Sequence, residues 1–153
     1  MRRFAASVTI VTAVDERGRP HGMAASAVTS VSVDPPSMLV AVNRAASLHP
    51  VLARAAHFCI NVLGSDQLDV VERFSRSDLR DRRFELGRWV TGTAGLPRLA
   101  DGRSAIFCRM DRIVDYATHS LHLGVVIDVA DGEASLPLVW LNGSRAEITS
   151  AAR

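Results

Sequence analysis

Short apolar runs that alternate with polar residues occur along most of the chain, a pattern typical of β-strands. A stretch rich in small residues, 22–33, precedes the pair Pro35-Pro36, and a fully apolar run follows that pair. Together the runs predict about seven strands. The expected strands cover residues 7–14, 22–33, 38–42, 58–63, 105–116, 120–129 and 136–141.

Helical spacing of apolar residues occurs in only two segments. Residues 48–56 are expected to form one helix with Ser47 as its N-cap, and residues 66–75 form a second helix capped by Ser65. Residues 2–6 are interpreted as the end of a further helix. The many strands and few helices favour a mostly β, Greek-key-like antiparallel barrel, although periodicity alone leaves a β-sandwich open.

The segment between the second helix and the strand at 105–116 has a less regular pattern. The charged stretch 77–88 is expected to be irregular or to form a short helical piece. Residues 89–90 are expected to end a strand, and a long turn should follow over 91–97.

Composition narrows the class of protein. The 153 residues, 48% of them hydrophobic and 22% charged, predict a single globular domain over 1–153. The net charge of +2, without blocks of like charge, argues against a nucleic-acid partner, and no apolar run approaches the ~18 residues of a membrane span. Cys59 and Cys108 lie in apolar strand-like runs, which indicates buried thiols and a reducing, cytoplasmic compartment.

Candidate chemistry begins in the small-residue stretch. A strand with so little side-chain volume is expected to lie against a flat molecule or another backbone, and tight sheet packing is the alternative. The residues concerned are Ala24, Ala25, Ser26 and Ala27.

A second group of polar residues follows the apolar strand at 38–42. Asn43, Arg44, Ser47 and His49 bring a cation, a hydroxyl and an expected helix N-terminus together, which is the chemistry of an anion site. The alternative roles are a turn residue for Asn43 and a helix cap for Ser47.

An ordered set of segments, spread over nearly the whole chain, resembles the flavin reductase-like group of FMN-binding split-barrel proteins. The set comprises Val8-Thr-Ile-Val-Thr12, Gly22-Met-Ala-Ala-Ser26, Asp34-Pro-Pro36, Val42-Asn-Arg44, Ser47-Leu-His-Pro50, Phe58-Cys-Ile-Asn-Val-Leu63, Arg83-Phe84, Gly95-Leu-Pro97, His119 and Gly124. The chain differs from the group's usual pattern at Ala24, where a threonine is common, and at Ala117-Thr118, where Gly-Asp is common.

The resemblance implies a split β-barrel that transfers hydride from NADH or NADPH to FMN or FAD. It also implies a homodimer with flavin near the interface, and a partner flavin-dependent monooxygenase that receives reduced flavin. Two alternatives stay open: a flavin-binding protein with little reductase activity, and a related split-barrel oxidoreductase with another substrate.

The resemblance also assigns roles to residues. The stretch from Ala24 to Ala27 is expected to form the slot for the flavin ring, with Ser26 at its pyrimidine edge and Asn43 near the ring or ribityl chain. The expected phosphate ligands are Arg44, Ser47, His49 and Arg83.

His119 is the expected catalytic residue at the nicotinamide, and its alternative role is a turn histidine. His122 is expected on the same face of the strand as His119. No third ligand has suitable spacing, so we expect no metal site.

Overall fold

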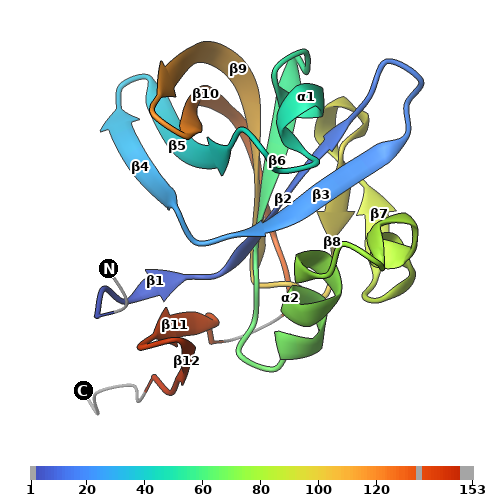
Figure 1. Cartoon of the computed structure of the whole chain (residues 1–153), viewed down its shortest axis with the longest axis vertical. Coiled ribbons are helices and arrows are strands. Elements are labelled where there is room, and N and C mark those ends of the chain that lie inside the picture. The colour runs from blue at the N-terminus through green and yellow to red at the C-terminus, as the bar shows by residue number, and fades with distance from the viewer. Residues whose placement is uncertain (1–2, 134–135, 149–153) are drawn as a thin grey trace.

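A computed structural model describes residues 3–133 and 136–148 of the chain. Its main element is a seven-stranded antiparallel sheet with the order β3-β2-β6-β9-β10-β5-β4 (Figure 1). The strands are β2 (Thr9–Val14), β3 (Pro20–Ala25), β4 (Val28–Val33), β5 (Pro36–Asn43), β6 (His57–Val62), β9 (Ser104–Tyr116) and β10 (His119–Asp131).

The two edges of this sheet are joined by consecutive strands. The expected single strand over 22–33 divides at Ser26-Ala27, so that β3 pairs with β2 at one edge and β4 pairs with β5 at the other. At the division, Ala41 N on β5 donates to Ala27 O at 2.9 Å. The sheet therefore wraps into a barrel, which confirms the predicted mostly β, antiparallel architecture.

Three apolar clusters pack on the barrel, and the third consists of Cys59, Leu96, Ala105 and Phe107. The interior cluster is closed at one end by the short helix α1 (His49–Leu52), where Leu48 and Leu52 are almost completely buried. A second cluster lies outside the barrel wall, where Ile10 of β2 packs with Val70 and Phe74 of helix α2 (Leu68–Ser75). These two helices therefore flank β3 on different sides (Figure 1).

The remaining elements are small. Strands β1 (Ala6–Ser7), β11 (Val139–Leu141) and β12 (Ser144–Ala146) form a three-stranded sheet, and β7 (Trp89–Thr91) pairs with β8 (Pro97–Leu99). The 3₁₀ helix η1 (Arg80–Glu85) lies between α2 and β7, and the 3₁₀ helix η2 (Thr93–Gly95) lies between β7 and β8.

Several expected boundaries were wrong. The described part of 2–6 contains a turn and the start of β1 rather than a helix, because Ala6 and Ser7 pair with Trp140 and Val139. The last expected strand, 136–141, shortens to β11, because Gly64 bridges to Pro137 outside the regular ladder. The long turn expected over 91–97 is the connection of the β7–β8 hairpin.

Both expected helix caps were wrong. α1 ends at Leu52 rather than at residue 56, because Ala56 O already accepts Met110 N from the sheet, and its N-cap residue is Leu48 rather than Ser47. α2 begins after Gln67, whose side chain accepts from Gly64 N at 2.8 Å. Neither helix has a side-chain cap bond.

The two cysteines are buried, free thiols, as the sequence predicted. Burial, joined at Cys59 by the nearby Cys108, raises the pKa of both thiols to about 12. Both side chains therefore act as small hydrophobic groups at neutral pH. Among the described residues, no helix combines the length and apolar character that a membrane span requires.

Candidate functional site

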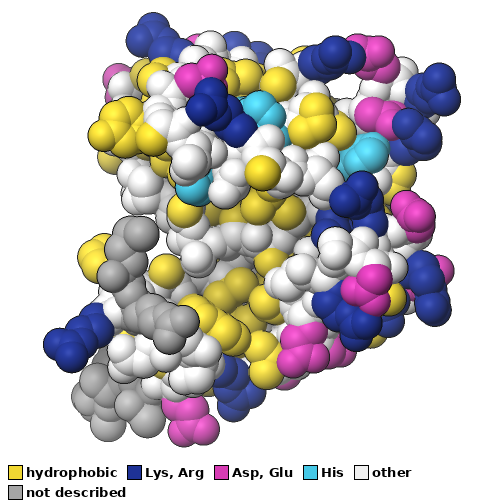
Figure 2. Space-filling model, viewed as in Figure 1, with side chains coloured by type: hydrophobic (Ala, Val, Ile, Leu, Met, Phe, Trp, Pro, Cys, Tyr) yellow, Lys and Arg dark blue, Asp and Glu magenta, His cyan; other side chains and the backbone are white. Residues whose placement is uncertain are grey.

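The end of β3 borders an apolar hollow of about 250 Å³. On the face seen in Figure 2, hydrophobic side chains gather in a depression in the middle of the molecule, with histidine side chains above it. Three of the four predicted slot residues, Ala24, Ala25 and Ser26, line the hollow, whereas Ala27 does not. The other lining residues are Val8, Val71, Ser75 and Trp140.

Arg83 lies close to the same strand in an unusual environment. Its side chain is only 7% exposed, and its Nη1 donates to Gly22 O of β3 at 2.9 Å. Its Nη2 donates to Arg76 O at 3.3 Å, while its buried Nε has no partner among the described residues. Burial, aided by the nearby charge of Arg80, lowers the pKa of Arg83. The guanidinium is thus held by carbonyl groups, and it forms no ion pair with a residue in the described ranges.

Arg83 and Ser47 line one groove of about 360 Å³, although they are distant in the sequence. Ser47 and Leu48 come from the loop before α1, Arg80 and Arg83 from η1, and the floor from β3. The groove is predominantly basic, since Asp81 is the one acidic residue beside its arginines and histidine. The full lining is Arg19, Pro20, His21, Gly22, Ser47, Leu48, Arg80, Asp81, Arg83 and Phe84.

Gly22 allows β3 and α2 to approach closely below this groove. A Cβ at this position would lie 2.8 Å from Phe74 Cε1 and 3.2 Å from Val11 O. The close approach presses the outer wall of the barrel against α2, while Gly22 O is bound by Arg83. Position 22 therefore favours glycine because any larger residue would collide with Phe74.

Asn43 and Arg44 lie at the end of β5, against the turn between β9 and β10. Asn43 pairs with His119 in the sheet register, and its Oδ1 accepts Ala45 N at 2.9 Å. Arg44 N donates to Thr118 O at 3.0 Å, and its guanidinium donates to Ala117 O. The structure thus places Asn43 as a turn residue and Arg44 as a brace for the turn. Neither residue lines the groove of Ser47 and Arg83.

His119 begins β10 and is half-buried. Thr118 Oγ1 lies 2.9 Å from His119 Nδ1, within hydrogen-bonding distance. Thr118 stands at the position where the resembling group commonly has aspartate, so a hydroxyl takes over the contact to the ring. The turn can therefore orient the imidazole without a neighbouring carboxylate.

His49 belongs to a different network, inside the mouth of the barrel. Its Nε2 lies 2.9 Å from Ser120 Oγ, which donates to Asp115 Oδ1 at 2.5 Å. Since the single hydroxyl hydrogen of Ser120 is given to Asp115, the network requires His49 Nε2 to donate to Ser120.

The edge of His49 meets His122, with ring centroids 6.1 Å apart. His122 is fully buried, and both of its ring nitrogens lack a described partner. Burial, aided by His49, lowers the pKa of His122. The expectation that His119 and His122 share a face was wrong, because strand residues three apart point to opposite sides. No cluster of three metal-ligating side chains occurs within the described ranges.

The sequence reasoning missed several residues of the site. Trp140, Val8 and Val71 were not among the expected site residues, yet all three border the hollow at Ala24. His21 was not among them either, yet it lines the groove of Ser47 and Arg83. Local spacing gave no signal for these locations, because β11, α2 and the residue before β2 meet the end of β3 only in the folded chain.

The two spaces lie in sequence along one strand. Ala24 to Ser26 border the apolar hollow, and Pro20 to Gly22 border the basic groove. The four steps from Gly22 to Ser26 span about 13 Å at the usual strand rise of about 3.3 Å per residue. The arrangement suits a ligand with a flat apolar part and an anionic end.

Comparison with known proteins identifies the class to which this fold and site belong. The model of the flavin reductase-like domain family matches residues 1–149, so the chain belongs to that family.

Two curated relatives agree with the family match. The chain is 38% identical over 143 residues to the reductase component of the FADH₂-dependent resorcinol hydroxylase of Rhizobium sp. strain MTP-10005, covering 93% of this chain and 80% of that protein. It is also 38% identical over 143 residues to the NADH:riboflavin 5′-phosphate oxidoreductase of Streptomyces pristinaespiralis, covering 92% and 80%.

A solved structure agrees as well. The NADH:FAD oxidoreductase SgcE6 of Streptomyces globisporus, solved with NAD and FAD fragments, superimposes with a TM-score of 0.90 and 28% identity. The likeness covers 98% of this chain and 89% of that one. The structural similarity therefore covers nearly the whole chain, in agreement with the predicted split barrel.

Proposed function

We propose that this protein is an NADH:flavin oxidoreductase that transfers hydride from NADH to FMN or FAD. The observation that carries the proposal is the order of spaces along β3, in a chain of the flavin reductase-like family. An apolar hollow beside Ala24 is followed by a basic groove containing a buried arginine that has no carboxylate partner among the described residues. NADH is the hydride donor in the names of these relatives.

The residues present fit a flavin. The small side chain of Ala24 leaves space beside Val71 and Trp140, and Ser26 offers an exposed hydroxyl for a pyrimidine edge. Alanine at position 24, where the resembling group commonly has threonine, removes one hydroxyl and widens the hollow. The ring edge therefore relies on backbone N–H groups and Ser26.

The phosphate of the flavin fits the groove. Arg83 presents an unused Nε and Ser47 presents a hydroxyl, so both can bind the anion. Arg44 and His49 stay predictions as phosphate ligands, since their described bonds run to the β9–β10 turn and to Ser120.

The chain's own residues prepare the reaction by positioning. A bound flavin supplies the hydride-accepting chemistry. His119, held through Nδ1 by Thr118, presents its other ring nitrogen to the nicotinamide carboxamide and keeps the donor in line. Arg44 supports that geometry by fixing the backbone of the turn at Ala117 and Thr118.

The protein functions as a homodimer. Large apolar side chains remain exposed on β4 and at the β9–β10 turn, with Val33 92% and Tyr116 74% exposed. A second copy that covers these side chains would remove their apolar surface from water.

Reduced flavin produced by this protein serves a partner monooxygenase in the cytoplasm. The resorcinol hydroxylase relative is named as a reductase component, and the flavin reductase component of a bacterial two-component tryptophan halogenase is 29% identical with a TM-score of 0.88. The two free, buried thiols agree with a reducing compartment.

Steady-state oxidation of NADH with added FMN or FAD tests the function. We expect turnover that depends on the flavin, and His119→Ala should lower kcat roughly 100-fold while the flavin affinity changes little, because the imidazole acts on the nicotinamide. Thr118→Val is the companion variant, with a smaller loss of kcat. Flavin bound without NADH turnover would instead support a flavin-binding protein, and an unchanged kcat in His119→Ala would remove its role.

A further inference from the structure

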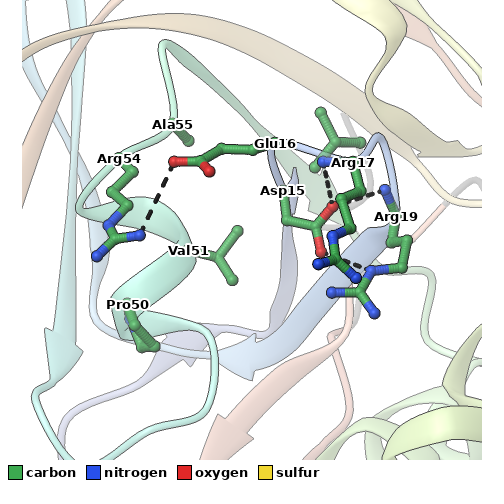
Figure 3. A pocket seen from close by; sticks show the side chains of 9 residues that line it. Asp15, Glu16, Arg17, Arg19, Pro50, Val51, Arg54 and Ala55 are labelled. Carbon is green, nitrogen blue, oxygen red and sulfur yellow. Dashed lines mark hydrogen bonds and ion pairs between the residues drawn. The ribbon is translucent and has the colours of Figure 1, made fainter.

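A third hollow, of about 410 Å³, lies between the β2–β3 turn and α1 (Figure 3). Apolar side chains from the end of β2 and from α1 form its floor. Charged side chains of the turn and Arg54 form its rim, with Arg54 directed across the opening toward Glu16. The lining residues are Val14, Asp15, Glu16, Arg17, Arg19, Pro50, Val51, Arg54 and Ala55.

The acidic groups of this rim are already engaged. Asp15 Oδ1 accepts the backbone N–H groups of Arg17 and Arg19 at 2.9 and 3.0 Å, and its Oδ2 receives Arg19 Nε at 2.8 Å. These bonds, with the backbone bond from Arg19 as the largest influence, hold the pKa of Asp15 far below its usual value. Asp15 therefore organises the turn and aims its arginines.

Two arginines of the rim remain available to an anion. Arg54 Nη1 lies 3.8 Å from Glu16 Oε1, and both side chains are more than three-quarters exposed, so this is a loose ion pair. Arg17 forms no ion pair in the described part of the chain. A phosphate at the opening can therefore recruit both guanidinium groups.

The hollow continues from the proposed flavin-phosphate groove. Arg19 lines both spaces, and the chain that borders the groove with Ser47 and Leu48 borders the hollow with Pro50 and Val51. Along β3 and the β2–β3 turn, the order is therefore the apolar hollow at Ala24, the basic groove of Ser47 and Arg83, and this third hollow with its basic rim. FMN would fill the first two spaces, and FAD has a second half for the third. NADH reacts while a flavin fills the first two spaces, so only its adenosine half can use this series of spaces, in the third.

We propose that this hollow binds the adenosine-phosphate half of a dinucleotide, either FAD or NADH, which rests on the proposed function. The adenine ring lies on the apolar floor of Val14, Pro50 and Val51, and a phosphate meets Arg17 and Arg54. The volume falls within the range of small-molecule sites.

Binding and kinetic measurements with paired ligands test this assignment on the full chain. The double variant Arg17→Ala/Arg54→Ala should weaken FAD binding roughly tenfold and leave FMN unchanged if FAD is the source. If NADH is the source, the KM for NADH should rise roughly tenfold and that for reduced nicotinamide mononucleotide should stay unchanged. ADP should compete with the affected dinucleotide in the wild type and fail to do so in the variant.

Val51→Trp, which fills the floor without a change of charge, should reproduce the same selective loss. Arg112→Ala removes an exposed arginine of β9 that lines none of the three spaces, and it should change neither ligand pair. Equal losses of affinity for both ligands of each pair, or no loss of affinity in either variant, would overturn the assignment of this hollow. The proposed function would then still stand. Failure of the wild type to bind any flavin would overturn the proposed function, and this inference with it.

Discussion

Arg83 combines features that rarely occur together at a single residue. Its guanidinium is nearly buried, yet it is held by the carbonyl groups of Gly22 and Arg76 and has no carboxylate partner among the described residues. A buried cation of this kind is costly unless an anion completes its environment. The flavin phosphate is that anion in the proposed function.

Arg83→Lys should weaken FMN binding roughly tenfold while it changes riboflavin binding little, because lysine keeps the charge but lacks the planar fork. Fluorescence titration with the two flavins, which differ in the phosphate, measures the difference. A variant that loses FMN and riboflavin affinity equally would show that Arg83 supports only the strand.

His122 provides a test of buried charge at the residue scale. Its folded-state pKa is below the usual value near 6.5, so the unfolded chain binds a proton more readily than the folded chain as the pH falls through this region. The free energy of unfolding of the wild type should therefore fall as the pH drops below about 6.5, by up to about 1.4 kcal/mol per pH unit until the folded-state pKa is reached.

His122→Leu removes this titration, so its stability should depend less on pH over the same window. Urea unfolding at several pH values measures both slopes, and all other groups are common to the two proteins. Identical slopes would show that the buried imidazole does not contribute to acid sensitivity.

At the scale of elements, β3 borders both spaces that are proposed to hold the flavin. Its small residues predicted a flat ligand or close packing. The structure shows close packing at Gly22 against Phe74 and a hollow beside Ala24, and the flat ligand stays a prediction. The division at Ser26-Ala27 was not predictable, because small residues continue through it without a break in the pattern. The early end of α1 was not predicted because the pairing of Ala56 with Met110 depends on a distant strand.

Gly22→Ala should destabilise the fold by about 1–3 kcal/mol, since the added Cβ would meet Phe74 and displace α2 from β3. Denaturant unfolding measures the loss. The double variant Gly22→Ala/Phe74→Leu is the control, because the smaller leucine side chain should make the two effects less than additive. Simple additivity would exclude the contact with Phe74 as the cause.

At the scale of the whole molecule, the site is an assembly of segments that meet only after folding. The loop before α1 supplies Ser47, η1 supplies Arg83, and β11 supplies Trp140, all around β3. The sequence predicted Ser47 from the pattern of an anion site and Arg83 through the family resemblance, and it did not assign Trp140 to the site. Local spacing carries no information on which distant elements border one strand, so these contacts needed the three-dimensional structure.

Titration of FMN into the wild type and into Ala24→Trp tests most directly whether the space beside β3 holds the flavin ring. The indole should fill the hollow, so we predict that the wild type binds FMN and that Ala24→Trp loses at least tenfold in affinity and most NADH turnover. Val129→Trp, at an exposed position of β10 that lines none of the three spaces, should behave as the wild type does. Undiminished FMN binding by a folded Ala24→Trp protein would contradict the account.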